Sequence, residues 1–397
     1  MSQKKKIIIM FLAALLLYLH AGCWSRREIN ELAFVMALGI DSLDGGKLYK
    51  VSVQTANTKT FAKEGSGSTE EKSFAVYTAT GATPAEAVRN LSQQLPRRLL
   101  LSHCRLVLIS ENLAKSGVEP VLDFLQRNRE VRETVWVLVA KGQADVLLEQ
   151  EFDMEDIPAD TLSRLIKLGE ETSRGYAATK RDFLYKLTTA RIDPVAASVE
   201  VLPDVAREGK PGVQLGGLAV FRADKLAGWL DAKETRGFLW VTGEAAAGSI
   251  VLDSPLVPGK VTFEFLRVQS RVTPQVRDGR VVILLDVETQ GDLGDLAEPW
   301  VSRGQDNSGG GMEELIKEVE RGVQETIEDE ILAALHRVQR EYKADIFGFG
   351  DAIHRRLPNE WRKIEERWDE IYPSLEIHIK VSANLRSSGQ TCHYRHR

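Results

Sequence analysis

The sequence predicts an α+β fold: a multi-domain body of mixed sheets packed against helices, behind a lipoprotein signal peptide. Extended segments rich in β-branched residues recur along the chain, and stretches with helical periodicity alternate with them. In addition, a single apolar run near the N-terminus stops at a cysteine. The 397 residues, of which 43% are hydrophobic and 27% charged, have the composition of a globular protein with two or three domains.

The N-terminal apolar run has the features of a secretory signal peptide. Lys4–Lys6 supply the positive charge, and residues 7–19 are apolar but shorter than the roughly 20 residues that a membrane-spanning helix needs. Small residues at 21–22 precede Cys23, the arrangement that a lipoprotein signal peptidase cleaves. Cys23 is therefore expected to carry S-diacylglycerol, with or without an N-acyl chain. His20 stands where an aliphatic residue is usual, which bears on the efficiency of processing; an uncleaved anchor and an ordinary signal peptide are the alternatives.

Charge argues against nucleic acid as a partner. Removing residues 1–22 takes away three lysines and no acidic residue, so the formal charge of −5 becomes −8. Nucleic-acid binding needs a basic face. No polybasic segment follows Cys23, so attachment to a membrane would depend on the acyl chains, at about 0.8 kcal/mol per buried methylene.

Two cysteines remain after Cys23. Cys104 begins an apolar run and is expected to be a buried thiol, whereas Cys392 lies in a polar tail. A Cys104–Cys392 disulfide is the less favoured alternative, because exported proteins that depend on disulfides usually contain more cysteines.

Residues 23–204 are expected to form an N-terminal α/β domain. Thr83 followed by Pro84 predicts a helix to about Leu95, because proline is favourable at the first helical position. The other predicted helices are at about 118–128, 160–171 and 179–189. The predicted strands are 32–41, 47–56, 73–81, 105–110 and 134–140, with an exposed loop at 59–72.

A linker rich in glycine and charged residues is predicted at 205–213. A C-terminal α+β region at 214–397 follows it, and an alternative is that this region consists of two subdomains that divide near 255. Asp231 is expected to cap a short helix, and Asp278-Gly279 to turn between two long strands. The other predicted elements are a strand at 215–221, a flexible loop at 303–311, a helix at 361–372 and a strand at 375–385.

The most regular helix is predicted at 312–343. Its apolar residues recur every three or four positions, which predicts a face directed toward the core. They are Leu315, Val319, Val323, Ile327, Ile331, Leu335, Val338 and Tyr342. Acidic residues in its first half and basic residues at its end suit the helix dipole.

The sequence does not predict an enzyme. It contains no HExxH zinc motif and no GxSxG nucleophile motif, and no base is paired with a nucleophile. Cys392, His393 and His396 are metal-ligand types, but three residues in a terminal tail do not complete a tetrahedral site. We therefore expect no metal and no cofactor apart from the lipid on Cys23.

Charged residues beside predicted rigid elements are the candidates for docking a partner. Arg127, Arg129 and Arg132 precede the apolar strand at 134–140. Asp351 and Arg355 follow the glycine-rich "IFGFG" segment. The alternative is that these residues form solvated surfaces, and that the glycines only supply unusual dihedral angles between two helices.

Five long segments resemble one known family, the Ger(x)C lipoproteins, which are the C subunits of spore germinant receptors. The segments are "GCWSRREINELAFVMALGID", "FLQRNREVRETVWVLVAKG", "AVFRADKLAGWLDAKETRGFLWVTG", "TFEFLRVQSRVTPQVRDGR" and "ADIFGFGDAIHRRLPNEWRKIEERWDEIYPSLEIHIKV". The resemblance implies diacylglycerol on Cys23 and a mixed α/β body of several domains. It transfers no catalytic residue, because the family has none established.

The resemblance also implies a function: a non-enzymatic subunit of a nutrient-sensing germinant receptor, needed for nutrient-triggered germination. The expected partners are two integral membrane subunits, A-type and B-type, and the membrane itself through the lipid anchor. The expected location is the outer face of the cytoplasmic membrane, which is the inner membrane of the spore. Whether this subunit binds a small molecule stays open. A solute-binding lipoprotein that feeds a transporter is the alternative, and a cell-wall hydrolase is less favoured because no acid/base pair was found.

Overall fold

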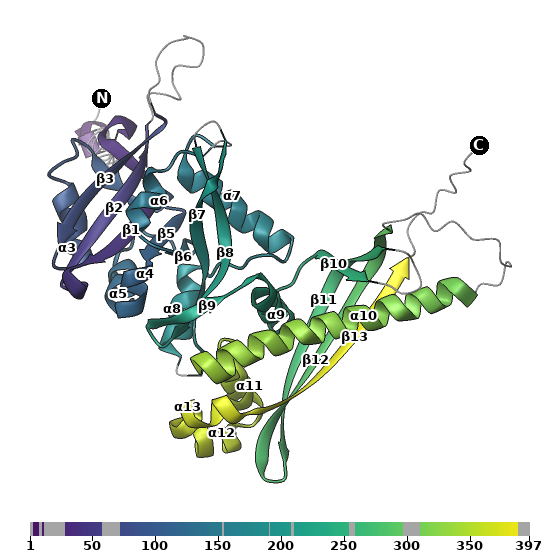
Figure 1. The fold of residues 1–397 in the computed structure, drawn as a ribbon. Helices are drawn as coiled ribbons and strands as arrows, with labels where there is room; N and C mark the ends of the chain where they lie inside the picture. The colour runs from purple at the N-terminus through teal and green to yellow at the C-terminus, as the bar shows by residue number, and fades with distance from the viewer. Residues whose placement is uncertain are drawn as a thin grey trace, which may run out of the picture.

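Two separate β-sheets organise the computed structural model of the chain (Figure 1). The structure describes residues 3–7, 10–11, 28–57, 72–152, 155–189, 191–207, 210–253, 259–296 and 310–387. No helix in these ranges combines the length and the apolar character that crossing a membrane requires. The predicted α+β class, with mixed sheets packed against helices, is confirmed.

The first sheet has nine strands in the order β3-β2-β1-β5-β6-β7-β8-β9, with β4 paired to β1. Strands β1, β5, β6 and β7 run parallel to one another, and antiparallel strands flank them on both sides. The strands are β1 (Leu32–Leu43), β2 (Leu48–Ala56), β3 (Phe74–Gly81), β4 (Arg98–Leu100), β5 (Leu106–Ser110), β6 (Trp136–Ala140), β7 (Val195–Arg207), β8 (Lys210–Arg222) and β9 (Lys225–Leu230).

Helices cover both faces of this sheet, as the apolar strands predict. In β5, Val107 and Ile109 belong to one buried cluster, while Leu106 and Leu108 belong to another on the opposite face. The helices are α3 (Pro84–Leu91), α4 (Glu111–Ser116), α5 (Glu119–Arg127), α6 (Ala144–Glu149), α7 (Pro158–Glu171) and α8 (Lys180–Thr188).

Two helix starts predicted from the sequence have the expected caps. The Thr83 side chain accepts a hydrogen bond from the Glu86 backbone N–H, with Pro84 at the first helical position of α3. Asp231 and Glu234 form a reciprocal capping box at the start of α9 (Ala232–Thr242).

The second sheet has four strands in the order β10-β11-β12-β13. Its strands are β10 (Gly248–Asp253), β11 (Lys260–Arg277), β12 (Arg280–Leu296) and β13 (Glu376–Ser387). Strands β11 and β12 form the predicted long hairpin, and Asp278 and Gly279 turn it with φ values of 49° and 76°. Strand β13 pairs with β12 in parallel, after a crossover that includes α10 (Gly310–Leu335).

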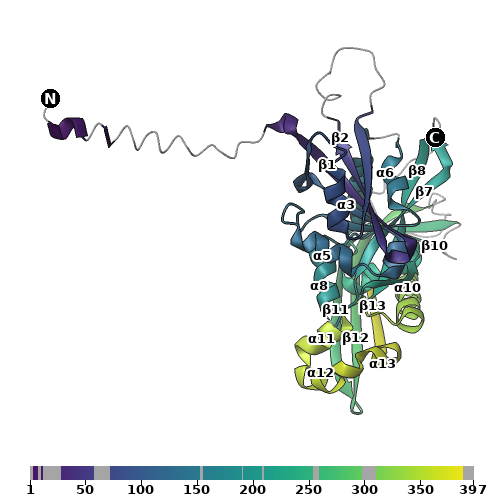
Figure 2. The same cartoon turned by 90° about the vertical axis from the view of Figure 1, so that its left-hand side faces the viewer.

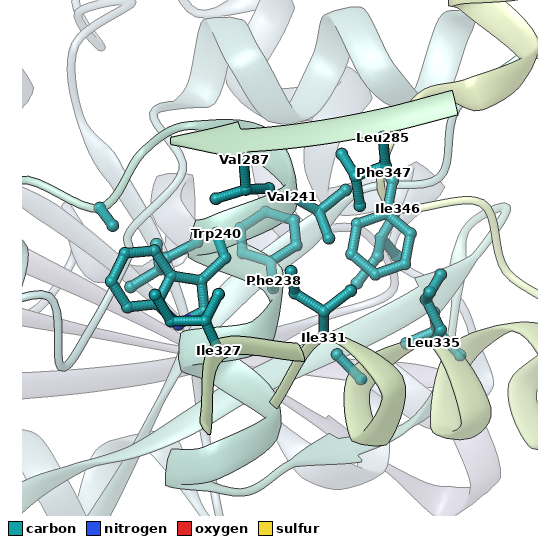
Figure 3. Close-up of a cluster of buried hydrophobic side chains, with 14 of the residues drawn as sticks. Phe238, Trp240, Val241, Leu285, Val287, Ile327, Ile331, Leu335, Ile346 and Phe347 are labelled. Atoms are coloured by element: carbon teal, nitrogen blue, oxygen red, sulfur yellow. The ribbon is translucent and has the colours of Figure 1, made fainter. Parts of the chain in front are cut away.

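The apolar face of α10 packs on this sheet and on α9 (Figure 3). All members of the predicted stripe up to Val338 are buried, and Tyr342 is partly buried. The single helix predicted at 312–343 changes geometry, however. It continues from α10 as a π-helix, η5 (His336–Tyr342), and ends at Lys343, whose φ is 54°. This change of winding turns the Tyr342 side chain toward the first sheet.

Helices α9 and α10 cross in close contact. A Cβ atom on Gly237 would overlap the backbone oxygen of Glu330, so only glycine fits there. Glu330 is buried and accepts hydrogen bonds from Arg236 Nε at 2.7 Å and from Trp240 Nε1 at 2.8 Å. A second nitrogen of Arg236 contacts the other oxygen of Glu330, which completes a bidentate pair between the two helices.

The helix predicted at 361–372 is broken into short pieces. They are α12 (Pro358–Ile364), η6 (Glu365–Arg367), α13 (Trp368–Ile371) and η7 (Tyr372–Ser374), preceded by α11 (Phe349–Arg356). The breaks bring Trp361, Trp368 and Tyr372 into one buried stack, with successive ring centroids 5.3 and 5.7 Å apart. In a regular helix, residues seven positions apart are separated by about 10 Å along the axis. The contact between Trp361 and Trp368 therefore depends on the breaks, and packing overrides local propensity.

Residues 205–213 do not form the predicted irregular linker. Apart from 208–209, which lie outside the described residues, they belong to β7 and β8, which pair as a hairpin. By sheet membership, residues 210–230 therefore lie with the first sheet. Glycine and proline at 209–212 made this part of the chain look like a linker in the sequence. The division of the chain into domains stays a prediction.

Candidate functional site

The two sheets meet at a joint built around residues 343–350, the segment that contains the "IFGFG" sequence. Asp345 is buried within it. Its Oδ1 accepts hydrogen bonds from the backbone N–H groups of Gly348 (2.9 Å) and Phe349 (3.1 Å), and its Oδ2 accepts one from Gly350 (2.8 Å). Gly348 has a φ of 75°, which glycine adopts without strain. One carboxylate thus shapes the whole turn before α11.

Asp193, just before β7, binds this turn to the first sheet. Its Oδ2 accepts a hydrogen bond from the backbone N–H of Asp345 at 2.8 Å, and its Oδ1 accepts one from Ala223 at 2.9 Å. The backbone N–H of Asp193 donates in return to the carbonyl oxygen of Asp345 at 2.8 Å. Asp193 and Asp345, which are distant in the sequence, therefore hold the turn between β8 and β9 against the segment that leads into α11.

Burial raises the pKa of Asp345 to about 7, although three backbone donors lower it. Burial also raises the pKa of Asp193. The charge of Asp193 acts to raise the pKa of Asp345, and both carboxylates act to raise the pKa of the buried Tyr372. The joint therefore holds two carboxyls whose ionisation is disfavoured by their surroundings.

The free energy of unfolding is expected to fall as the pH rises from about 4 to about 7. A carboxyl with a raised folded-state pKa contributes stability that is complete below its unfolded pKa and is lost as the pH passes the folded value, by about 1 kcal/mol per pH unit while it titrates. Denaturant unfolding of wild type and Asp345→Asn across this range checks it. The asparagine variant should show the shallower decline, and parallel profiles would contradict the assignment to Asp345.

A second connection closes one edge of the first sheet. The Tyr342 hydroxyl donates to the carbonyl oxygen of Trp229 at 2.9 Å and accepts from the Trp229 backbone N–H at 3.1 Å. Trp229 lies in β9, the edge strand, so the hydroxyl takes the place of a neighbouring strand. Gly228 leaves room for the ring, because a Cβ there would overlap it.

A cavity of about 480 Å³ opens between the two sheets beside this joint. Phe238 from α9 and Phe347 from the joint segment stack with their ring centroids 6.1 Å apart, and Tyr176 meets Phe238 edge-on at 5.4 Å. Figure 3 shows Phe238, Ile346 and Phe347 gathered above the α10 face. The cavity is lined by Trp136, Glu170, Tyr176, Ala177, Thr179, Asp182, Tyr185, Lys186, Ile192, Phe238, Thr242, Glu244, Ile346 and Phe347.

Lys186 of α8 brings a cation to the cavity. Its Nζ lies 5.6 Å from the ring centroid of Tyr176 and 5.9 Å from that of Phe238. Burial lowers the pKa of this ammonium group, while the charges of Asp182 and Glu244 act in the opposite direction. In contrast, burial and the charge of Glu244 raise the pKa of the Glu170 carboxyl group.

The predicted arginines lie on a different surface. Arg127 ends α5 and pairs with Asp123, with 2.8 Å between Nε and Oδ1. Arg129 and Arg132 follow it and are exposed. Arg127 and Arg129 line a groove of about 620 Å³ whose other walls include Tyr49, Ala82, Thr83, Pro84, Ala85, Pro120 and Phe124.

The loop that carries these arginines is held from beneath by Lys180, the first residue of α8. Its buried Nζ donates to the carbonyl oxygens of Leu125 (3.3 Å) and Val131 (3.1 Å) and pairs with Glu133 at 2.9 Å. The arginines therefore project from a fixed backbone.

Asp351 and Arg355 lie in α11 and pair with each other at 3.1 Å. Asp351 is mostly buried and also faces Arg191, with 3.6 Å between Arg191 Nε and Asp351 Oδ1. It thus links α11 to the segment before β7, whereas Arg355 is exposed. Figures 1 and 2 place α8 between α5 and α11, so the two predicted docking sites are separated by that helix.

The remaining residues that the sequence singled out are the cysteines and the candidate metal ligands. Cys23 lies outside the described residues, as do the terminal Cys392, His393 and His396. Cys104 is the buried free thiol that the sequence predicts, and burial raises its pKa to about 12. In the described ranges, no group of three or more His, Cys, Asp or Glu residues is arranged to hold a metal.

Sequence reasoning missed the joint and the cavity. It singled out "ADIFGFGDAIHRR" but interpreted it as a connection between helices, and it did not select Asp193 or Lys186. Asp345 carried a usable signal, because an aspartate three to five residues before a run of glycines is suited to accept their backbone N–H groups. Nothing local marks Lys186, whose surroundings come from both sheets.

Comparison with known proteins relates this chain to spore germination proteins. Two family models match in succession: the spore germination protein N-terminal domain over residues 25–201, and the spore germination B3/GerAC like, C-terminal domain over residues 216–389. The crystal structure of the GerBC protein superposes with a TM-score of 0.53 at 19% identity, covering 90% of this chain and 99% of that one. The two-sheet α+β body is thus the fold of a solved protein.

The relatives extend over the whole chain. Spore germination protein KC of Bacillus subtilis (strain 168) is 28% identical, with 97% of this chain and 96% of that protein covered. Spore germination protein B3 of the same organism is 25% identical, with 98% and 99% covered. The chain belongs to the Ger(x)C family of spore germination proteins, as its sequence predicts.

Proposed function

We propose that this chain is a non-enzymatic, lipid-anchored subunit of a germinant receptor and is needed for nutrient-triggered spore germination. The observation that carries the proposal is similarity to spore germination proteins along 97% of the chain, through both sheets and the joint. The role of the buried carboxyls supports a non-enzymatic protein. Asp193 and Asp345 have perturbed pKa values, but their oxygens are occupied by backbone N–H donors that hold the joint together.

The proposed anchor is diacylglycerol on Cys23, at the outer face of the cytoplasmic membrane, which is the inner membrane of the spore. Confinement to a surface raises the effective concentration of membrane partners, so weak docking contacts suffice. The proposed partners are two integral membrane subunits, A-type and B-type. The proposed contacts are Arg127 and Arg129 at the groove beside α5, together with the exposed Arg132. Asp351 and Arg355 of α11 are the second candidate surface.

A solute-binding lipoprotein is less well supported. Such a protein closes two similar α/β lobes around its ligand. Here the first sheet is mixed, with nine strands and helices on both faces, whereas the second has four strands crossed by one long helix.

Deleting the gene is expected to abolish or strongly slow germination by one set of nutrients, and to leave germination by agents that bypass receptors near normal. Wild-type protein should restore the response. Cys23→Ala should restore it only weakly, because losing the tether removes the concentration advantage without unfolding the body. Optical-density loss of purified spores measures the response, and immunoblots verify equal protein level. Equal impairment of both routes would refute the receptor assignment.

The same strains test the docking surfaces. Glutamate at Arg127, Arg129 and Arg132 together should reduce co-purification of the membrane subunits and the nutrient response. Arg321→Glu, at an exposed arginine of α10, serves as the control. If both co-purification and the nutrient response stay at the wild-type level, these arginines form only a solvated surface. Charge reversal at Asp351 and Arg355 of α11 is then the next test.

A further inference from the structure

The second sheet ends in a strand whose outer edge is unpaired. In the described part of the chain, β13 pairs only with β12, and Figure 1 shows it at the margin of the sheet. The strand has 12 residues and contains no proline. A long edge strand without proline is a template on which another strand can pair.

The backbone groups along this edge are free over most of its length. The Leu385 N–H donates to Glu320 Oε1 of α10 at 2.9 Å, so it points away from β12. Because backbone groups alternate in direction along a strand, the other residues in phase with Leu385 also direct their N–H and C=O groups outward. Within the described ranges, no hydrogen bond engages the outward groups of these residues, which are Ile377, Ile379, Val381 and Ala383.

The side chains of β13 divide into an apolar row and a polar row, as alternation along a strand requires. On the α10 side, Ile377, Ile379 and Val381 pack against the core but are only partly buried. The polar row lies on the opposite face and consists of Glu376, His378, Lys380, Ser382, Asn384 and Arg386. A strand added at this edge therefore needs the same alternation, with its apolar row on the side of α10.

A second copy of β13 has this alternation, and an antiparallel pairing centred on Val381 matches both rows. Ile377 then opposes Leu385 of the second copy, and Val381 opposes its own copy across a two-fold axis. In the polar row, Glu376 opposes Arg386 of the second copy, so a dimer contains two pairs of opposite charge. No like charges oppose each other in the remaining pairs, which are Ile379 with Ala383, His378 with Asn384 and Lys380 with Ser382.

Other registers fit less well. A slip by one residue turns the apolar row of the second copy toward the polar face. A slip by two residues in one direction places Lys380 opposite Lys380 of the second copy, and like charges directly opposite are destabilising. A slip by two residues in the other direction leaves Glu376 without Arg386. The pattern of β13 therefore selects one register with its own copy.

We infer that two copies of this chain associate through β13, in antiparallel register about a two-fold axis at Val381. The contact joins two four-stranded sheets into one continuous sheet. A strand of 12 residues supplies about half of the roughly 20–30 residues that each side of a standard interface contains, so we expect a dissociation constant of about 1–100 µM. The inference goes beyond the proposed function and does not depend on it, because it concerns association of the chain with itself.

Cysteine cross-linking of the full-length protein in detergent micelles tests the register. Val381→Cys, in a Cys392→Ser background, should give a disulfide-linked dimer under mild oxidation. Its two Cα atoms would lie about 5.5 Å apart, within the range of a disulfide. Lys380→Cys should cross-link much less, because diagonal positions lie about 7–8 Å apart. Val251→Cys, at an exposed valine of the other edge strand, β10, is the matched control for random collisions, and the Cys392→Ser parent measures background from Cys23.

A charge swap tests the partner. Glu376→Arg places two arginines opposite each other, and Arg386→Glu places two glutamates opposite each other. Each single variant should weaken dimerisation at least about threefold, as measured by sedimentation velocity across protein concentrations. The double variant Glu376→Arg/Arg386→Glu should restore it, because the opposite charges face each other again. Glu264→Arg, at an exposed glutamate of β11, is the matched control and should behave as wild type.

Three results would overturn the inference. They are a wild-type protein that stays monomeric up to about 100 µM, cross-linking of Val381→Cys no greater than that of Val251→Cys or Lys380→Cys, and a double charge variant that associates no better than the single ones. Melting temperatures show whether each variant is folded, since Glu376 also pairs with His378 and Arg386 with Asp292. If a charge variant does not fold, wild-type sedimentation and the cysteine variants decide the outcome.

Discussion

Asp345→Ala is expected to lower the free energy of unfolding by about 3 kcal/mol. The substitution removes the acceptor for the backbone N–H groups of Gly348, Phe349 and Gly350, which lie in a buried turn. Each buried donor left without a partner costs about 1–3 kcal/mol, and the relief from burying a carboxyl offsets part of the sum. Denaturant unfolding monitored by tryptophan fluorescence measures the loss.

Asp369→Ala is the matched control for this measurement. Asp369 lies in α13 and is exposed, and it pairs with Arg222 at a distance of 3.4 Å. Exposed pairs of this kind contribute about 0–1 kcal/mol, so the control should barely change. Equal losses in the two variants would show that Asp345 does not organise the joint.

Glu330→Ala is expected to cost a similar amount, about 3 kcal/mol, for a different reason. It leaves the guanidinium of Arg236 without its carboxylate and the indole N–H of Trp240 without an acceptor, where α9 and α10 cross. Breaking one side of a buried ion pair typically costs about 3–5 kcal/mol, and the partial exposure of Arg236 places this case at the lower end.

The double variant Arg236→Met/Glu330→Met tests that reason. With both charges replaced by apolar side chains of similar volume, most of the lost stability should return. Glu325→Ala on the exposed face of α10 serves as the control. If the double variant is less stable than either single variant, the cost arises from lost packing volume and not from an unpaired charge.

The sequence predicted those elements whose signals are local. Thr83-Pro84, Asp231 and Asp278-Gly279 each specify a cap or a turn through their own backbone preferences, and each lies where expected. The apolar spacing from Leu315 to Val338 likewise identified the buried face of α10 and the start of η5, because the helical periodicity determines which side of the helix is buried.

The failures occurred where distant contacts decide the structure. The change to a π-helix at His336 places Tyr342 on β9, more than a hundred residues earlier in the chain. The hairpin of β7 and β8 looked like a linker because its pairing partners, not its composition, make it a sheet. The candidate site was out of reach for the same reason: Lys186 and Asp193 acquire their surroundings only when the two sheets meet.

The parallel pairing of β12 with β13 has a consequence for the order in which the chain folds. Strand β13 is the last described element, and residues 297–375 separate it from its partner. Closing so long a loop costs entropy before any contact between the strands is gained. Most strands of the first sheet pair with strands that are nearer to them in the sequence. The first sheet is therefore able to form while the second sheet still lacks its edge strand β13. During synthesis from the N-terminus onward, the joint would therefore be assembled late, because the segment that forms it follows a first sheet that is already in place.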